Sequence, residues 1–182
     1  MVTPQLEVFY KRWLNKAHNY KVDCLTELYD KFITLYIIYN SLYIEVFNIS
    51  QKSKKGFSEY RAATDNIIQY INSSFFIENL FYNEDLSAIC QLIEQEKFYI
   101  IFEVNNNGIR QPLLEKDKDL LKRLKSRSKN SKAKAILELI YNIRCNLIHG
   151  GKGFEEEQSQ LLIPVTHLLE KTIEIVYSKL KK

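Results

Sequence analysis

An arginine and a histidine near the C-terminal end of the chain have residue types and a spacing that could support phosphodiester chemistry. Arg144 and His149 enclose four residues, and two glycines and Lys152 follow. An imidazole can exchange protons near neutral pH, and a guanidinium or an ammonium group can pair with a phosphate. Because Gly150 can end a helix in a left-handed cap, His149 should lie at an exposed corner beside Lys152. These three side chains predict a receptor for a phosphodiester at one helix end.

The helix that positions this motif is expected to run from 131 to 150 and to have two unlike faces. At 100° per residue, one face is apolar and should lie in the core. That face comprises Ile136, Ile140, Ile143 and Leu147. The opposite, polar face comprises Glu138, Asn142, Cys145 and His149, with Asn146 beside them. Arg144 belongs to neither face.

Arg144 is the unusual position of this helix, because its neighbours one turn away are apolar. They are Ile140, Tyr141, Leu147 and Ile148. A charge in such surroundings needs a carboxylate, a phosphate or a partner chain. One alternative to a functional role is therefore an ion pair inside the protein, with Glu45 or Asp30 as candidates. For His149 the alternative is a plain helix-end residue that the helix dipole favours.

In these residues the chain resembles the HEPN superfamily (higher eukaryotes and prokaryotes nucleotide-binding), whose Arg-x4–6-His motif has the same setting. The resemblance is strongest over 141–152, YNIRCNLIHGGK, which ends one helix ahead of a last C-terminal helix. A second segment, 38–43, IYNSLY, is similar to the aromatic-Asn-x-Leu-Tyr segment of some prokaryotic members. Asn40 and Tyr43 share a helical stripe with Tyr36. These three residues either line the site or belong to the core.

The resemblance implies a helical domain that often pairs through its motif helices and so joins two motifs in one composite site. Many members are metal-independent ribonucleases of toxin–antitoxin, abortive-infection or CRISPR-linked defence systems. His149 would then be the general acid and base, and Arg144 the phosphate clamp. Active members commonly have a polar residue, often Asn, directly after the Arg, whereas this chain has Cys145 there. Asn146 is the expected substitute.

Two functions from different classes follow from the resemblance. The first is a metal-independent RNA endonuclease without a cofactor, which cleaves by attack of the ribose 2′-OH and acts as a homodimer. Its expected substrate-binding residues are Lys152, Tyr141, Asn142, Asn40, Tyr43, Lys125 and Arg127. The second is a non-catalytic module that binds a nucleotide, or a partner such as a nucleotidyltransferase-type antitoxin. The cysteine after Arg144 favours the second function.

A basic segment from 116 to 134 is a further candidate for contact with RNA. It contains nine Lys or Arg residues against two Asp, a local charge of +7, which leaves the rest of the chain at −3 because the total is +4. Lys and Arg at this density can neutralise phosphates. A solvated helix and loop without a partner is the alternative interpretation.

The composition indicates helices as the framework for these residues. Hydrophobic residues make up 46% and charged residues 26% of the 182, while Gly (5) and Pro (3) are too scarce for the turns of an all-β fold. We expect an all-α fold, an up-and-down bundle of about five main helices in one domain spanning 1–182. A short irregular or extended insertion is expected near 97–110, where the β-prone FYIIFEV precedes the turn NNNG.

Hydrophobic periodicity and capping residues give the bounds of the expected helices. The ranges are 4–19, 23–48, 58–74, 84–95, 117–125, 131–150 and 155 to the C-terminal end, with a kink at Pro164. The second helix should be the spine of the bundle. Its apolar stripe comprises Leu25, Leu28, Phe32, Leu35, Ile38, Leu42 and Val46.

Several features predict a cytoplasmic protein without a membrane segment or a metal site. No basic segment followed by an apolar run stands at the N-terminus, and the apolar stretch 32–47 alone is too short and too polar to span a bilayer. Cys24, Cys90 and Cys145 are far apart and form no C-x-x-C pair, which favours free thiols in a reducing compartment. His18 and His167 have no metal-ligand spacing.

Overall fold

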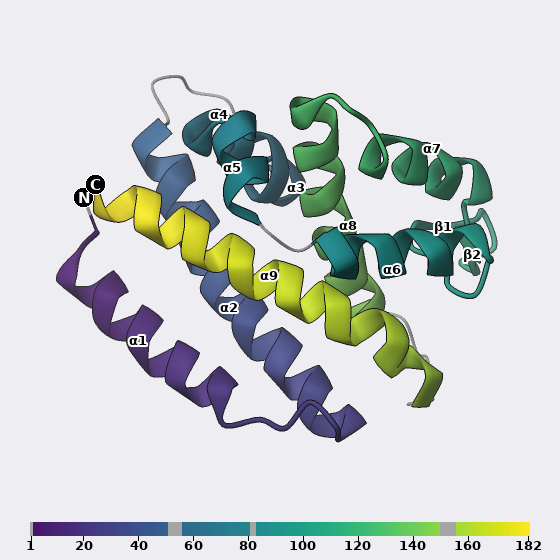
Figure 1. Cartoon of the computed structure of the whole chain (residues 1–182), viewed down its shortest axis with the longest axis horizontal. Coiled ribbons are helices and arrows are strands. Elements are labelled where there is room, and N and C mark those ends of the chain that lie inside the picture. Colours follow the sequence, from purple (N-terminus) through teal and green to yellow (C-terminus); the bar gives the residue numbers. More distant parts are fainter. Residues whose placement is uncertain (1, 51–55, 81–82, 150–155) are drawn as a thin grey trace.

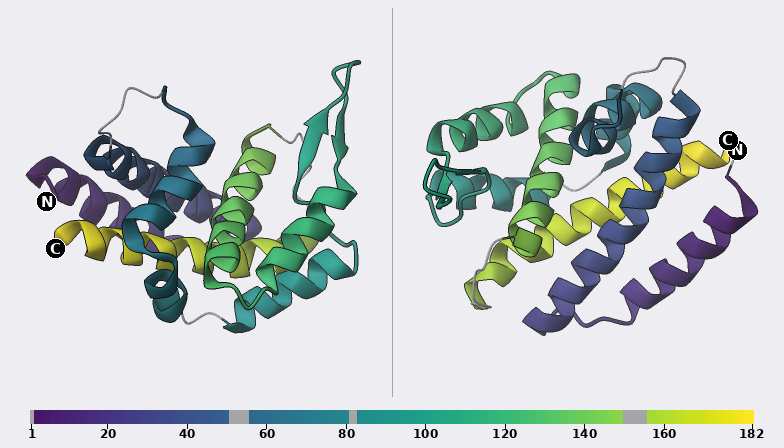
Figure 2. Two further views of the ribbon diagram at one scale, coloured as in Figure 1. Left: turned by 90° about the horizontal axis from the view of Figure 1, so that it is seen from above. Right: turned by 180° about the vertical axis from the view of Figure 1, so that it is seen from behind.

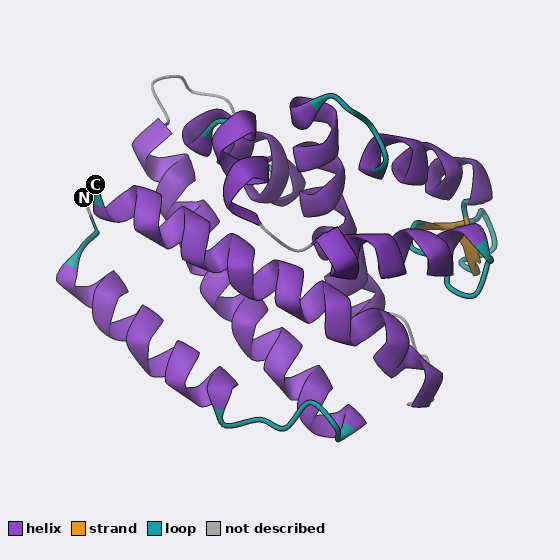
Figure 3. Cartoon of the chain, viewed as in Figure 1, coloured by secondary structure: helices purple, strands orange, loops and turns teal. Residues whose placement is uncertain are grey.

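The computed structural model describes residues 2–50, 56–80, 83–149 and 156–182, and these form the all-α fold expected from the composition. Helices make up most of the described chain, and one pair of short strands lies among them (Figure 3). The helices are α1 (Pro4–His18), α2 (Leu25–Ser50), α3 (Glu59–Arg61), α4 (Ile67–Ile71), α5 (Ser73–Leu80), α6 (Asn83–Glu94), α7 (Leu114–Leu124), α8 (Lys129–His149) and α9 (Ser159–Lys181). A π-helical turn, Ala62–Asn66, joins α3 to α4, and a 3-10 turn, Glu156–Gln158, precedes α9.

Two long helices, α2 and α9, lie against each other and form the centre of the bundle, with α1 on the outer side of α2 (Figure 1). The predicted apolar stripe of α2 is confirmed, because its residues from Leu28 to Val46 are fully buried. α8 also packs against α9, and the rear view shows that α2 and α8 cross α9 on the same side (Figure 2). The two helices that contain the candidate site residues therefore share one side of the molecule.

An apolar helix such as α2 is found either across a membrane or in the core of a folded domain. The helix has 26 residues and a mean hydropathy of 1.3 over its most apolar window, so by length and composition alone it could cross a membrane. Half of that window is buried inside the protein. Packing against α1 and α9 accounts for an apolar helix at this place without a membrane.

The helix expected over 58–74 is interrupted twice. It changes to a π turn after Arg61, and it ends at Asn72, whose φ of 80° lies in the left-handed region. Asn tolerates this conformation better than most residues. The side-chain Oδ1 of Asn72 also accepts hydrogen bonds from the amides of Ser74 (2.9 Å) and Phe75 (3.4 Å). Asn72 thus ends α4 and caps α5, so the prediction of one helix up to residue 74 was wrong.

The insertion expected near 97–110 is a β-hairpin. β1 (Phe102–Val104) pairs antiparallel with β2 (Arg110–Pro112), and Glu103 lies opposite Gln111. At the tip, Oδ1 of Asn105 accepts hydrogen bonds from the amides of Asn107 and Ile109, and Gly108 has a positive φ of 75°. The predicted turn chemistry is therefore confirmed.

The starts of α7 and α8 differ from the predicted ones. α7 begins at Leu114 rather than at 117, because the Asp117 carboxylate does not cap the helix and instead accepts hydrogen bonds from the amides of Ile100 (3.0 Å) and Ile101 (2.9 Å). α8 begins at Lys129 rather than at 131, with Oγ of Ser128 accepting a hydrogen bond from the amide of Ser131. Residue 155, the expected start of the last helix, lies outside the described residues, and the kink expected in the second turn of α9 stays a prediction.

Candidate functional site

Arg144 lies half-buried where α2, α3 and α8 meet. Its Nη2 is 3.3 Å from Oε1 of Glu59, the first residue of α3, and its guanidinium carbon is 5.2 Å from the ring centre of Tyr36 on α2. The ion pair weighed from the sequence thus exists, but its partner is Glu59 and neither Glu45 nor Asp30. A helical wheel of α8 could not identify this partner, since α3 comes from a distant part of the sequence.

Glu59 also brings Tyr43 into the site. The Tyr43 hydroxyl donates a hydrogen bond to Oε1 of Glu59 at 3.0 Å, which is the same oxygen that contacts Arg144. Burial raises the pKa of the Tyr43 phenol, so it stays neutral and remains a donor. Tyr43, a predicted site residue, is therefore linked to Arg144 through the carboxylate of Glu59. The sequence had indicated Glu59 only as a residue at the start of a helix.

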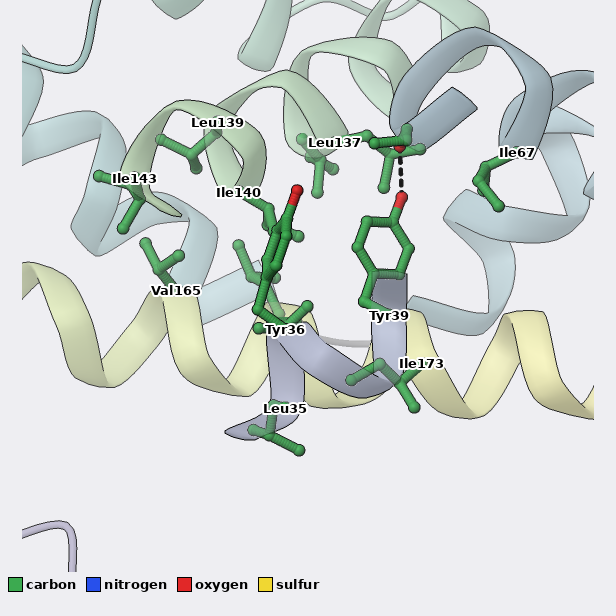
Figure 4. Close-up of a cluster of buried hydrophobic side chains, with 14 of the residues drawn as sticks. Leu35, Tyr36, Tyr39, Ile67, Leu137, Leu139, Ile140, Ile143, Val165 and Ile173 are labelled. Atoms are coloured by element: carbon green, nitrogen blue, oxygen red, sulfur yellow. Dashed lines mark hydrogen bonds between the residues drawn. The ribbon is translucent and has the colours of Figure 1, made fainter. Parts of the chain in front are cut away.

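Two buried tyrosines of α2 point from that helix toward α8 and the π turn (Figure 4). The hydroxyl of Tyr39 donates a hydrogen bond to the carbonyl of Ala63 within the π turn. The hydroxyl of Tyr36, a residue only 4% exposed, has no hydrogen-bond partner among the described residues, and neither has the buried Nε of Arg144. π turns recur at functional sites, and this one directly follows α3.

A second polar network lies one turn earlier on α8. Glu138 forms an ion pair with Arg123 of α7 at 2.6 Å, and Arg123 also contacts Asp119 at 2.7 Å. These hydrogen bonds raise the pKa of the Arg123 guanidinium. Asn142, a predicted site residue, donates a hydrogen bond to the carbonyl of Glu138 at 2.8 Å. The network fixes α7 against α8.

Tyr141, also a predicted site residue, packs edge-on against Tyr60, with ring centres 5.3 Å apart. Burial raises the pKa of each phenol to about 12, so both are neutral near pH 7. Cys145, directly after the motif arginine, has its Sγ 4.0 Å from Nη1 of Arg144. Aromatic rings and a thiol thus line the side of α8 that faces α3.

Asn146 connects α8 to the β-hairpin. Its Oδ1 accepts a hydrogen bond from Nη2 of Arg110 at 2.5 Å, and its Nδ2 donates one to the carbonyl of Ile100 at 2.9 Å. The Arg110 guanidinium also lies over the ring of Phe102, 4.6 Å from its centre. Both polar atoms of the Asn146 amide therefore have structural partners, a role that the sequence prediction of a catalytic Asn146 did not include.

The remaining predicted residues do not all gather at the motif. Lys125, which pairs with Glu94, and the exposed Arg127 lie next to the N-terminal end of α8. The 21 residues of α8 are about 30 Å long, so this end is far from the motif within one chain. Asn40 is half-buried on α2, one turn from both Tyr36 and Tyr43.

The end of the motif is only partly within the described structure. His149 is the last residue of α8, as predicted, but its side chain and Lys152 lie outside the described residues. Within the described ranges, His, Cys, Asp and Glu side chains form no group of three that could hold a metal ion. In comparisons with known proteins, no family model, curated protein or solved structure matches this chain.

Proposed function

We propose that the protein is an RNA endonuclease that needs no metal ion and cleaves by transesterification between two copies of the chain. The observation that supports the proposal is the placement of Arg144. A half-buried guanidinium, paired with a single carboxylate oxygen, lies about one and a half helical turns before His149 at the end of α8. An arginine in this setting can exchange its carboxylate for a phosphate.

In the proposed reaction the ribose 2′-oxygen attacks the adjacent phosphorus and the bond to the 5′-oxygen breaks. A base takes the proton from the 2′-OH, and an acid gives a proton to the leaving 5′-oxygen. Arg144 neutralises charge that develops on the phosphate oxygens. The products are a 2′,3′-cyclic phosphate and a 5′-hydroxyl. His149 is the proposed proton-transfer group.

One motif supplies one imidazole, whereas this reaction uses a base and an acid. A two-fold homodimer would bring a second His149 and a second Arg144 to the same place. The sequence neighbourhood of Arg144 favours such a dimer, because exposed apolar side chains lie within four residues of Arg144, Glu59 or Tyr43 along the chain. They are Ile44 (38% exposed), Phe57 (55%), Tyr60 (39%) and Ile148 (48%). A protein interface would cover such exposed apolar side chains.

The catalytic proposal is tested by incubating the protein with structured RNA in EDTA. We expect cleavage that leaves 2′,3′-cyclic phosphate ends and that is lost in His149→Ala. His18→Ala is the matched control, because it removes a different imidazole, which lies on α1 and pairs with Glu170 of α9 at 2.5 Å. Cleavage that continues unchanged in His149→Ala would refute the assignment.

The dimer is tested separately by light scattering at micromolar protein concentration. The parent chain should have the mass of a dimer, and Ile148→Glu should have that of a monomer with unchanged helix content. Val104→Glu on the hairpin, which alters an even more exposed apolar residue (67%), should leave the dimer intact. A monomeric parent chain would contradict the proposal.

A non-catalytic binding module is the second candidate function. It is favoured by the pairing of Arg144 with Glu59 and by the cysteine that follows Arg144, where active HEPN proteins commonly have a polar residue. Such a module would bind a nucleotide without turnover, or a nucleotidyltransferase-type partner. Calorimetric titration with a nucleotide, followed by analysis for unchanged ligand, separates this function from the endonuclease.

A further inference from the structure

The carboxylate of Glu59 occupies the position from which an anion would bind Arg144. Its Oε1 is 3.3 Å from Nη2 of Arg144 and accepts a hydrogen bond from the buried Tyr43 at 3.0 Å. Tyr43 belongs to the core of α2 and is fully buried, so it fixes this oxygen in place. Glu59 thus lies beside the guanidinium because two helices hold it there.

The pair of Arg144 and Glu59 leaves the guanidinium incompletely satisfied. Nη2 lies 3.3 Å from one carboxylate oxygen, and the two parallel hydrogen bonds of the strongest arginine–carboxylate pairs are not formed between these described side chains. The buried Nε of Arg144 has no hydrogen-bond partner among the described residues, and Nη1 has the weak acceptor Sγ of Cys145 at 4.0 Å. The side chains are 21% and 36% exposed, so solvent and solutes reach the pair.

We infer that Glu59 is an internal competitor for the anion site of Arg144, and that a substrate phosphate must displace it. Without a substrate, the carboxylate neutralises and orients the guanidinium. When a phosphate binds, Arg144 exchanges one oxygen acceptor for another, and Glu59 remains nearby through Tyr43. This inference rests on the proposed function, because it assumes that Arg144 binds phosphate.

The inference also names a class of substrate. A carboxylate that stays beside the site repels any phosphate that enters, so a small anion held by Arg144 alone gains little. A polynucleotide contacts the protein through several phosphates, and the neighbouring contacts raise the effective concentration of the phosphate at Arg144. The ion pair of Arg144 with Glu59 therefore favours binding of a polynucleotide over binding of a mononucleotide or free phosphate.

The test compares Glu59→Gln with the parent chain in binding to a single-stranded RNA whose 2′-hydroxyls are methylated. Such RNA cannot be cleaved, so affinity is measured without turnover. Gln keeps the shape and the acceptor for Tyr43 but removes the charge. We expect the dissociation constant to fall about fivefold, the effect of one partly exposed ion pair. The fall should be larger for inorganic phosphate than for the RNA, because phosphate has no other contact.

Glu174→Gln is the matched control, since it removes the same charge from an ion pair with Lys171 (2.8 Å) on α9, outside the motif and the basic segment. It should leave both affinities unchanged. Arg144→Gln should lose binding of inorganic phosphate and should weaken binding of the RNA. If Glu59→Gln does not fold, Glu59→Asp takes its place, because the shorter side chain retracts the carboxylate and should give a smaller gain in affinity.

The outcomes separate this inference from the proposed function. If Arg144→Gln weakens binding but neither Glu59 variant strengthens it, Glu59 is not a competitor while the phosphate clamp stands. If Arg144→Gln binds both probes as the parent chain does, the phosphate clamp itself is wrong. Thermal unfolding gives an independent measurement. Phosphate should raise the melting temperature of Glu59→Gln more than that of the parent chain, and an equal rise in both would overturn the inference.

Discussion

Replacing Asn146 with alanine should release the β-hairpin from α8 while the helical bundle stays folded. The substitution removes a hydrogen bond to the carbonyl of Ile100 (2.9 Å) and one from the guanidinium of Arg110 (2.5 Å). A neutral hydrogen bond contributes about 1 kcal/mol and one to a charged group about 1.5–3 kcal/mol. The site is partly exposed, so water can replace part of the two lost hydrogen bonds. We therefore expect the free energy that holds the hairpin against α8 to fall by about 2 kcal/mol.

Hydrogen exchange measures this prediction more directly than global unfolding. Amides of 100–112 should lose protection in Asn146→Ala, whereas amides in the core of α2 and α9 should exchange as in the parent chain. Asn142→Ala is the control on the same helix, because its side chain bonds only the carbonyl of Glu138 one turn away, and its effect should be within about 0.5 kcal/mol.

The result also decides between two roles for Asn146. If RNA cleavage is lost while the hairpin amides keep their protection, Asn146 acts in the reaction, as the sequence predicted. If hairpin protection falls and cleavage falls with it, Asn146 acts by positioning the hairpin beside the motif. Unchanged exchange together with unchanged stability would refute the energetic argument drawn from its two hydrogen bonds.

Three further variants test other parts of the framework. Tyr39→Phe removes a buried hydrogen bond to the carbonyl of Ala63 and should lower the free energy of unfolding by about 1 kcal/mol in urea titration. Leu137→Ala, at a fully buried position of α8, should lower it by about 2–5 kcal/mol, measured in the same way. For Asp117, burial raises the pKa above 3.8 despite two backbone hydrogen bonds that lower it. The fold therefore favours the protonated carboxyl, so the parent chain should lose stability relative to Asp117→Asn as the pH rises from 4 to 7, and a constant difference would contradict this.

Local periodicity predicted the parts of the fold that depend on one helix at a time. The stripe of α2 from Leu28 to Val46 is buried, and the predicted core face of α8 is buried at Ile136, Ile140 and Ile143. Both follow from apolar residues at helical spacing, which need one side of the helix to face a core. α8 extends to His149, the residue that the sequence predicted as the last helical position before two glycines.

Contacts between distant segments could not be predicted in this way. Glu59 was visible only as an acidic residue at a helix start, and nothing in its local sequence links it to Arg144, 85 positions later. The π turn follows α3, and its Ala63 carbonyl accepts a hydrogen bond from Tyr39 of α2. Such pairings arise from how helices pack, and the periodicity of one helix does not reveal them.

Contacts with distant segments also change the electrostatics of the basic segment 116–134. Its formal charge of +7 overstates the charge available to a polyanion, because several of its cations have carboxylate partners from other elements or from the same helix. These pairs are Lys118–Glu115, Arg123–Asp119, Arg123–Glu138, Lys125–Glu94, Lys129–Glu78 and Lys134–Asp65. A nucleic acid would have to compete with these carboxylates as well as with solvent ions. If Arg144 binds phosphate as proposed, affinity at the motif should depend less on the count of basic residues than on how readily Arg144 exchanges Glu59 for a phosphate.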